Sequence, residues 1–230
     1  MYFVKTPYLV RKLYSRNRIW DFDDSGKVIY LTFDDGPVEE ITPWVLDILD
    51  KCDGKATFFC VGDNVSKYPE VFDEIISRGH AVGNHTFNHL NGWKTETKVY
   101  VENVMKCNEL FSTTLFRPPY GKIRPAQVSE LQKHFKIICW SVLTGDFDKE
   151  ITKEKCLEGI IKSASEGSIL CFHDSIKAKE NLYYALPIVL SHFKELGYTF
   201  ISIPYDLKPF IDFNDPDKDL KSMNFETIGK

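Results

Sequence analysis

The chain predicts an α/β fold, specifically a compact, incomplete (β/α)7-type barrel with mostly parallel strands. Strand-like and helix-like segments alternate along its 230 residues. The strand-like segments are continuous apolar runs, which is typical of strands that a parallel sheet buries on both faces. Seven such runs fall within about 175 residues, which suits a barrel that lacks part of its wall.

Seven strands are predicted from apolar runs that turn residues bound. In chain order they are Val28–Phe33, Ala56–Cys60, Ala81–Gly83, Leu115–Arg117, Lys136–Val142, Ser168–Phe172 and Thr199–Ile203.

Between these strands, apolar residues recur at helical spacing and predict four helices. Their apolar stripes lie within Ile41–Leu49, Val71–Ile76, Tyr100–Phe111 and Leu186–Phe193. Thr42 is the predicted N-cap of the first helix, because Pro43 suits the first helical position.

Composition excludes several classes of partner. The net charge is −4, and no basic track suggests binding to nucleic acid or to an anionic membrane surface. No segment is long and apolar enough to span a bilayer. The six cysteines form no Cys-x-x-Cys pair, so we expect buried thiols in a reducing compartment. Charged residues interrupt the apolar residues of Met1 to Trp20, which predicts no secretory signal and a cytoplasmic protein.

The length fits one large domain with short additions at both ends. We expect an N-terminal segment at 1–26 that packs on the barrel, a catalytic domain at 27–204 and a charged tail at 205–230. The sequence predicts no particular oligomeric state.

Polar residues follow most of the predicted strands directly. They are Asp34 and Asp35, His85 and His89, Arg117, Asp146, and His173 with Asp174. In parallel α/β folds the carboxyl ends of the strands meet at one rim, where active sites lie. These side chains are therefore expected to share one site.

Two imidazoles four residues apart and a carboxylate are a common ligand set for a divalent metal. Alone, the aspartate pair would favour an ordinary turn, and the histidine pair would more often be incidental. Together at one rim, Asp35, His85 and His89 favour a metal site. Asp34 is then available as a general base, and Arg117 could keep it ionised and oriented.

His173 could protonate a leaving group on the opposite side of this site, with Asp146 orienting its ring. Without Asp146, a histidine at this position would more often be structural. The alternative for Arg117 is a surface salt bridge, which the two prolines after it disfavour because they fix the backbone there.

Together these segments resemble the polysaccharide deacetylase family, the NodB-homology domain of carbohydrate esterase family four. The resemblance runs from about Lys27 to Ile203. The family motifs T-F-D-D-G-P, H-[ST]-x-x-H and R-x-P-Y are complete at Thr32–Pro37, His85–His89 and Arg117–Tyr120.

The resemblance implies a distorted, incomplete barrel and one divalent metal ion, usually zinc, with cobalt, nickel, manganese or iron as alternatives. It implies that Asp34 is the catalytic base and that Asp35, His85 and His89 are the metal ligands. It also implies that Arg117 steadies the base and that the backbone N–H of Tyr120 helps to bind the oxyanion.

Two family motifs are only partly retained. D-x-x-D-W aligns with Leu143–Phe147, which keeps Asp146 but has leucine and phenylalanine in place of aspartate and tryptophan. L-x-H aligns with Cys171–His173, which keeps the acid histidine. Phe147 and Cys171 are therefore expected beside the substrate, in surroundings that differ from those of the family.

These residues predict a hydrolase that removes the N-acetyl group of an amino sugar or polysaccharide and releases acetate. An acetylated saccharide is the expected partner, and the sequence does not choose the glycan. One alternative is cleavage of an O-acetyl ester or a small amide by the same machinery. Another is a catalytically impaired saccharide-binding protein, which the two partly retained motifs would favour.

Overall fold

The computed structural model describes residues 3–14, 17–23 and 26–205. An eight-stranded sheet forms the centre of the molecule, in the order β5-β4-β3-β2-β1-β7-β6, with β8 also paired to β1. The strands are β1 (Val28–Asp34), β2 (Thr57–Cys60), β3 (Ala81–Asn84), β4 (Leu115–Phe116), β5 (Lys136–Ile137), β6 (Val142–Leu143), β7 (Ile169–His173) and β8 (Thr199–Ile201).

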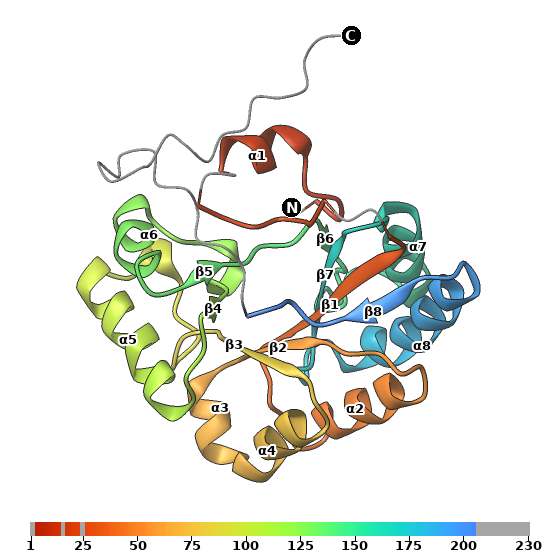
Figure 1. The fold of residues 1–230 in the computed structure, drawn as a ribbon, viewed down its shortest axis with the longest axis horizontal. Helices are drawn as coiled ribbons and strands as arrows, with labels where there is room; N and C mark the ends of the chain where they lie inside the picture. Colours follow the sequence, from red (N-terminus) through yellow and green to blue (C-terminus); the bar gives the residue numbers. More distant parts are fainter. Residues whose placement is uncertain (1–2, 15–16, 24–25, 206–230) are drawn as a thin grey trace, which may run out of the picture.

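All strand pairs of this sheet are parallel. The sheet curls on itself and α2 to α8 surround it (Figure 1), which confirms the predicted incomplete barrel. The helices are α1 (Tyr8–Leu13), α2 (Thr42–Asp50), α3 (Gly62–Lys67), α4 (Pro69–Ser77), α5 (Thr97–Leu110), α6 (Pro125–Leu131), α7 (Lys153–Ser163) and α8 (Lys179–Glu195), with short 3₁₀ turns η1 (Gly92–Lys94) and η2 (Pro119–Gly121).

β1 is the central strand, and from Ile29 to Asp34 it is buried. Its first half pairs with β8 and its second half with β2, while β7 pairs along most of its other edge. This register sets Asp34 beside His173 at the carboxyl ends of β1 and β7. Two residues that the sequence assigns to opposite proton transfers therefore lie on adjacent strands.

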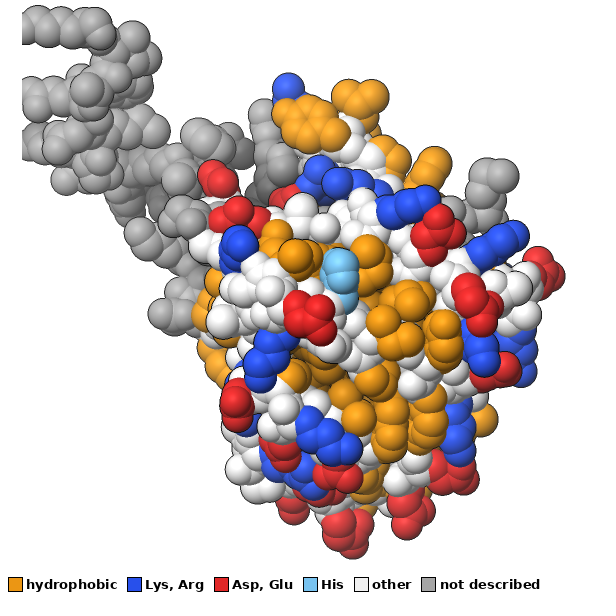
Figure 2. All heavy atoms as spheres, turned by 90° about the vertical axis from the view of Figure 1, so that its right-hand side faces the viewer, with side chains coloured by type: hydrophobic (Ala, Val, Ile, Leu, Met, Phe, Trp, Pro, Cys, Tyr) orange, Lys and Arg blue, Asp and Glu red, His pale blue; other side chains and the backbone are white. Residues whose placement is uncertain are grey.

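The hydrophobic core lies between the sheet and the surrounding helices. Phe33 stacks on Phe58 and Phe172, and α8 adds several buried residues to the same cluster. On the face that carries α7 and α8, hydrophobic side chains gather in the middle and charged side chains surround them (Figure 2). Leu157 and Ile161 of α7 are only partly buried and pack against this core, so part of its outer edge is exposed on α7.

The structure has four helices that the sequence does not predict, α1, α3, α6 and α7, and two further details differ from the prediction. The predicted strand Lys136–Val142 is divided into β5 and β6, because the backbone of Ile138 and Cys139 bonds to other partners. The Cys139 N–H donates to the Ile19 carbonyl, and the carbonyls of Ile138 and Cys139 accept from Arg117. These partners are distant in sequence, so no local pattern predicts them.

The predicted N-cap is wrong by one residue. α2 begins at Thr42, with Ile41 in the N-cap position. The Thr42 hydroxyl accepts from the Val38 N–H at 2.8 Å and donates to the Asp174 carboxyl group at 2.6 Å. Thr42 therefore fastens the turn after β1 to the loop after β7.

The N-terminal segment lies across the side of the barrel between β5 and β6. Isolated bridges join Lys5 to Val142, Ile19 to Ile138 and Asp21 to Ser168. The charged tail predicted at 205–230 lies outside the described residues, apart from its first residue. In the part of the chain that the structure describes, no helix has the length and apolar character needed to span a membrane. All six cysteines are free thiols, and Cys52 alone among them is partly exposed.

Candidate active site and metal centre

The adjacent aspartates at the carboxyl end of β1, Asp34 and Asp35, lie in different surroundings. Asp34 is the last residue of the strand and is 2% exposed. Asp35 has a φ of 82°, a left-handed conformation that is uncommon for a residue with a side chain. The amide of Asn64 donates to the Asp35 carbonyl at 2.7 Å and helps to hold this turn. Backbone strain of this kind clusters at functional sites, because only surrounding contacts can maintain it.

Asp35, His85 and His89 converge on one point. Asp35 Oδ1 lies 3.1 Å from His89 Nε2 and 3.7 Å from His85 Nε2. His89, like Asp35, has a positive φ, of 54°. One ligand atom from each of the three residues lies within 4.8 Å of the other two.

The protonation of these groups suits a cation. Nδ1 of His85 lies 2.7 Å from the Arg117 carbonyl, so this nitrogen carries the hydrogen and Nε2 presents its lone pair. Burial lowers the pKa of His85 to about 4, so the ring is neutral at neutral pH. Burial alone would raise the pKa of Asp35, but the hydrogen bond to His89 and the nearby positive charge of His173 outweigh it and lower the pKa. A carboxylate and two imidazole nitrogens fit a divalent cation.

Asp34 is held by a buried arginine. Arg117 Nη1 donates to Asp34 Oδ1 at 2.6 Å and to the Thr32 hydroxyl at 2.7 Å. Arg117 has no exposed surface, and its guanidinium lies 4.1 Å from the centroid of the Phe59 ring. With the carbonyls of Ile138 and Cys139 as further acceptors, the guanidinium is fixed on several sides.

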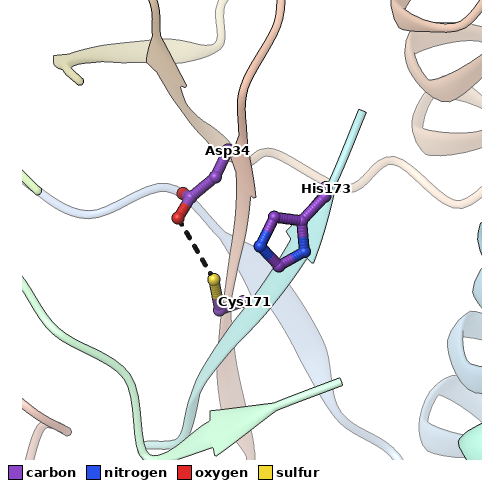
Figure 3. A group of neighbouring side chains, drawn as sticks. All are labelled: Asp34, Cys171 and His173. Atoms are coloured by element: carbon purple, nitrogen blue, oxygen red, sulfur yellow. Dashed lines mark hydrogen bonds between the residues drawn. The ribbon is translucent and has the colours of Figure 1, made fainter. Parts of the chain in front are cut away.

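Cys171 contacts the second oxygen of Asp34. Its thiol donates to Asp34 Oδ2 at 3.3 Å (Figure 3), and its sulfur lies 3.6 Å from Arg117 Nη1. Burial and the charge of Asp34 raise the pKa of Cys171 well above its ordinary value. The side chain is therefore a protonated donor rather than a thiolate nucleophile.

His173 is oriented by Asp146, as the sequence predicts. Asp146 Oδ1 lies 2.8 Å from His173 Nδ1, and Asp146 Oδ2 accepts from the His173 backbone N–H at 2.8 Å. The Thr144 hydroxyl donates to the same Asp146 Oδ1 at 2.9 Å. Burial acts to lower the pKa of His173, but the charge and hydrogen bond of Asp146 outweigh it and raise the pKa to about 9. The imidazole is thus protonated at neutral pH.

Asp34, Cys171 and His173 form a second cluster of potential ligand atoms, within 4.8 Å of one another (Figure 3). At neutral pH Cys171 and His173 both carry protons, given their raised pKa values. A cation would have to displace both protons beside the positive Arg117. This cluster is therefore unsuited to a metal, and because Cys171 already donates to Asp34, His173 is the donor of the three that is left for a substrate.

Asp174 is a site residue to which the sequence assigns no role. It is fully buried; its Oδ1 accepts from the Gly36 N–H at 3.1 Å, and its Oδ2 accepts from Thr42. Burial raises the pKa of Asp174 to about 8. A Cβ on Gly36 would lie 2.0 Å from Asp174 Oδ2, so glycine is needed there. The position of Asp174 directly after a predicted strand was the one signal that could have indicated it.

Of the three predicted substrate contacts, Tyr120 and Phe147 lie at the edges of the site, whereas Cys171 is fully buried against Asp34. Tyr120 is 58% exposed, has a φ of 61° and presents its ring edge-on to His89, with centroids 4.7 Å apart. Phe147 stands edge-on to His173 at 4.9 Å. Leu143, where the family has an aspartate, is buried, and its N–H donates to the Val4 carbonyl. Oxyanion binding by the Tyr120 N–H stays a prediction.

Comparison with known proteins finds similarity over most of this chain. Residues 22–136 match the family model described as polysaccharide deacetylase. This match includes Asp34, Asp35, His85, His89 and Arg117 but ends before Asp146 and His173.

Two proteins of Bacillus cereus, both named peptidoglycan-N-acetylglucosamine deacetylase, are similar to this chain. One is 32% identical in an alignment of 184 residues that covers 76% of this chain and 66% of that protein. The other is 30% identical in an alignment of 191 residues that covers 80% of this chain and 90% of that protein. The chain therefore spans just under two thirds of the first relative and most of the second.

Solved structures share the fold. A peptidoglycan N-acetylglucosamine deacetylase in complex with 4-naphthalen-1-yl-N-oxidanyl-benzamide is 28% identical with a TM-score of 0.77, and the match covers 86% of this chain and 95% of that one. A CE4 family pseudoenzyme from Bacillus anthracis is 26% identical with a TM-score of 0.72, and covers 81% of this chain and 67% of its own. The family model matches half of the chain, a relative that is 30% identical is matched over 90% of its length, and the barrel is shared, so the chain belongs to the polysaccharide deacetylase family.

Proposed function

We propose that this protein is a metal-dependent hydrolase that removes the acetyl group from the nitrogen of an acetylated amino sugar and releases acetate. One observation carries the proposal: the triad Asp35, His85 and His89 lies beside both a carboxylate held by arginine and an imidazole held by aspartate. The names of the relatives favour a saccharide that contains N-acetylglucosamine as the substrate.

Asp35, His85 and His89 would hold the divalent cation. The family resemblance favours zinc, and cobalt, nickel, manganese and iron are alternatives, because two imidazoles and one carboxylate do not select among these metals. When bound, the cation would polarise the acetyl carbonyl and acidify water beside it.

Asp34 acts as the general base. Its Oδ1 accepts from Arg117, while its Oδ2 accepts from the Cys171 thiol at 3.3 Å and lies 4.0 Å from His85 Nε2, so Oδ2 faces the triad. A carboxylate oxygen has two lone pairs, so Oδ2 keeps one with which to take the proton of the attacking water. Arg117 fixes the direction in which the carboxylate accepts this proton.

His173 acts as the general acid. Because Nδ1 is bound to Asp146, Nε2 is the nitrogen that can deliver a proton to the departing sugar nitrogen. An amine leaves poorly unless it is protonated, so this step is needed as much as the first. The raised pKa of His173 keeps the proton available at neutral pH.

Acetate release from N-acetylglucosamine oligosaccharides, with metal content measured on the same protein, tests the proposal. Asp34→Asn and His173→Ala should each lower kcat by roughly 10²–10⁴-fold while the bound metal is unchanged. Near-normal turnover in either variant would contradict the assigned role.

The same variants separate an amidase from an ester hydrolase. An alkoxide leaves more easily than an amide nitrogen, so His173→Ala should spare an O-acetyl ester more than an N-acetyl amide. Equal losses on both would remove the argument for His173 as the acid. A wild-type protein that binds the oligosaccharides but releases no acetate would instead support a saccharide-binding role.

A further inference from the structure

A cavity lies beside the candidate active site, on the side of His173. It has a volume of about 740 Å³, within the range of ligand pockets. Its walls are the loops after β6 and β7 and the first turns of α7 and α8. The lining residues include the ammonium groups of Lys149, Lys153, Lys177 and Lys179.

The charge of these walls is unlike that of the whole chain, which has a net charge of −4. Four ammonium groups face two carboxylates, those of Glu154 and Glu180. Lys179 is paired with Glu40 at 3.3 Å. Among the described residues, no carboxylate lies within 4.0 Å of the other three lysines. These lysines are therefore available to an anion.

The carboxylate of Glu154 already has partners. The backbone N–H of Glu154 itself and the Thr152 hydroxyl, both at the start of α7, lower the pKa of this carboxyl group. The N-terminal ends of α7 and α8, with 11 and 17 residues, both open on the cavity and add to its positive potential. Ile151, Ile176 and Tyr183 supply apolar wall beside these charges.

A chain of contacts connects the cavity to the proposed acid. Lys177 Nζ lies 5.4 Å from the centroid of the Phe147 ring, and that ring stands edge-on to His173. His173 is assigned to the nitrogen that stays on the sugar. The cavity therefore adjoins the saccharide side of the scissile bond rather than the acetyl side.

We propose that this cavity is a subsite for an anionic group carried by the acetylated saccharide, either a carboxylate or a phosphate. The inference rests on the proposed deacetylation, because that reaction orients the sugar toward His173. Lys149, Lys153 and Lys177 would pair with the anion, and the apolar wall would contact the rest of the attached group.

Three disaccharides of matched length test the subsite. They are neutral diacetylchitobiose, the disaccharide with N-acetylmuramic acid at its reducing end, and diacetylchitobiose 1-phosphate. At low salt, kcat/KM should be roughly tenfold higher for one anionic substrate than for the neutral one, and added salt should reduce the difference. Which anion is preferred identifies the source of the charge.

Lys149→Gln combined with Lys177→Gln should abolish this preference through KM, while kcat/KM for the neutral disaccharide changes by less than about twofold. Lys162→Gln is the matched control, because Lys162 lies on α7, is exposed, pairs with Glu158 and does not line the cavity. Thermal unfolding of all variants checks that they are folded.

Turnover of the neutral disaccharide without preference for either anion overturns the subsite and leaves the deacetylation intact. A preference that survives the double variant also overturns it. If metal-loaded protein releases no acetate from any of the three, the deacetylation itself fails and the subsite fails with it.

Discussion

Arg117 and Asp34 form a buried ion pair, and each depends on the other for its stability in the folded protein. Taking a charge out of water is costly, and the cost is offset only while its partner and further hydrogen bonds remain. Arg117 has these further partners in Thr32 and in the carbonyls of Ile138 and Cys139. The pair therefore sets both the stability of the site and the orientation of the base.

Arg117→Met should lower the free energy of unfolding by roughly 3–5 kcal/mol, because it leaves the Asp34 carboxylate buried without its cation. Adding Asp34→Asn to this variant should recover part of the loss, since no unpaired charge then remains. Urea denaturation of the two single variants and the double variant measures the coupling. Strictly additive effects would show that the two side chains do not act as a pair.

Asp146 controls the proton on His173. The folded-state pKa of His173 is about 9, above its ordinary value of 6.5, so the acid form is present below about pH 9 and is lost as pH rises through it. Asp146→Asn removes the charge that raises this pKa. The alkaline limb of the kcat–pH profile should then move to lower pH, while the acid limb stays in place. An alkaline limb at the same pH in both proteins would contradict this assignment.

At the scale of elements, the sequence predicts most of the barrel, because each β/α unit carries its own periodicity. It also predicts which residues share the site, since parallel strands bring their carboxyl ends to one rim. The sequence does not predict the break in the strand at Ile138 and Cys139. The partners of this backbone are Ile19, more than a hundred residues away, and Arg117, about twenty residues away. The sequence likewise assigns no role to Asp174. The hydrogen bonds by which Asp174 joins two loops, from Gly36 and Thr42, leave no local pattern.

These hydrogen bonds of Asp174 join the β1–α2 turn to the loop after β7. Gly36→Ala would place a Cβ 2.0 Å from Asp174 Oδ2, so the turn that carries Asp34 and Asp35 would have to shift. We expect a loss of roughly 1–3 kcal/mol in the free energy of unfolding and weaker metal binding.

Combining Gly36→Ala with Asp174→Ala should cost less than the sum of the two single variants, because the overlap disappears with the carboxyl group. Gly26→Ala is the control, since a Cβ there meets only Val28 at 3.9 Å. Chemical denaturation and metal titration follow both effects. A Gly36→Ala protein that binds metal normally would show that the turn does not need this fit.

At the scale of the whole molecule, the N-terminal segment adds isolated bridges to the side of the barrel. The backbones of Val4, Thr6 and Ile19 hydrogen-bond to Leu143, Ser141 and the Ile137–Cys139 stretch. The same stretch supplies carbonyls to Arg117, so the segment lies two contacts away from the general base. Ile19 also packs against the cluster that contains Tyr30 and Ile138.

Ile19→Asp should therefore lower the free energy of unfolding by roughly 2–4 kcal/mol, because it places a charge against this apolar cluster. Leu9→Asp adds the same charge to the same segment at a position that is 77% exposed, and should change stability by less than about 0.5 kcal/mol. If the segment also positions Arg117, Ile19→Asp should reduce kcat in protein that is still folded, whereas Leu9→Asp should not. Equal behaviour of the two variants in denaturation and acetate release would mean that the barrel and its site are complete without this segment.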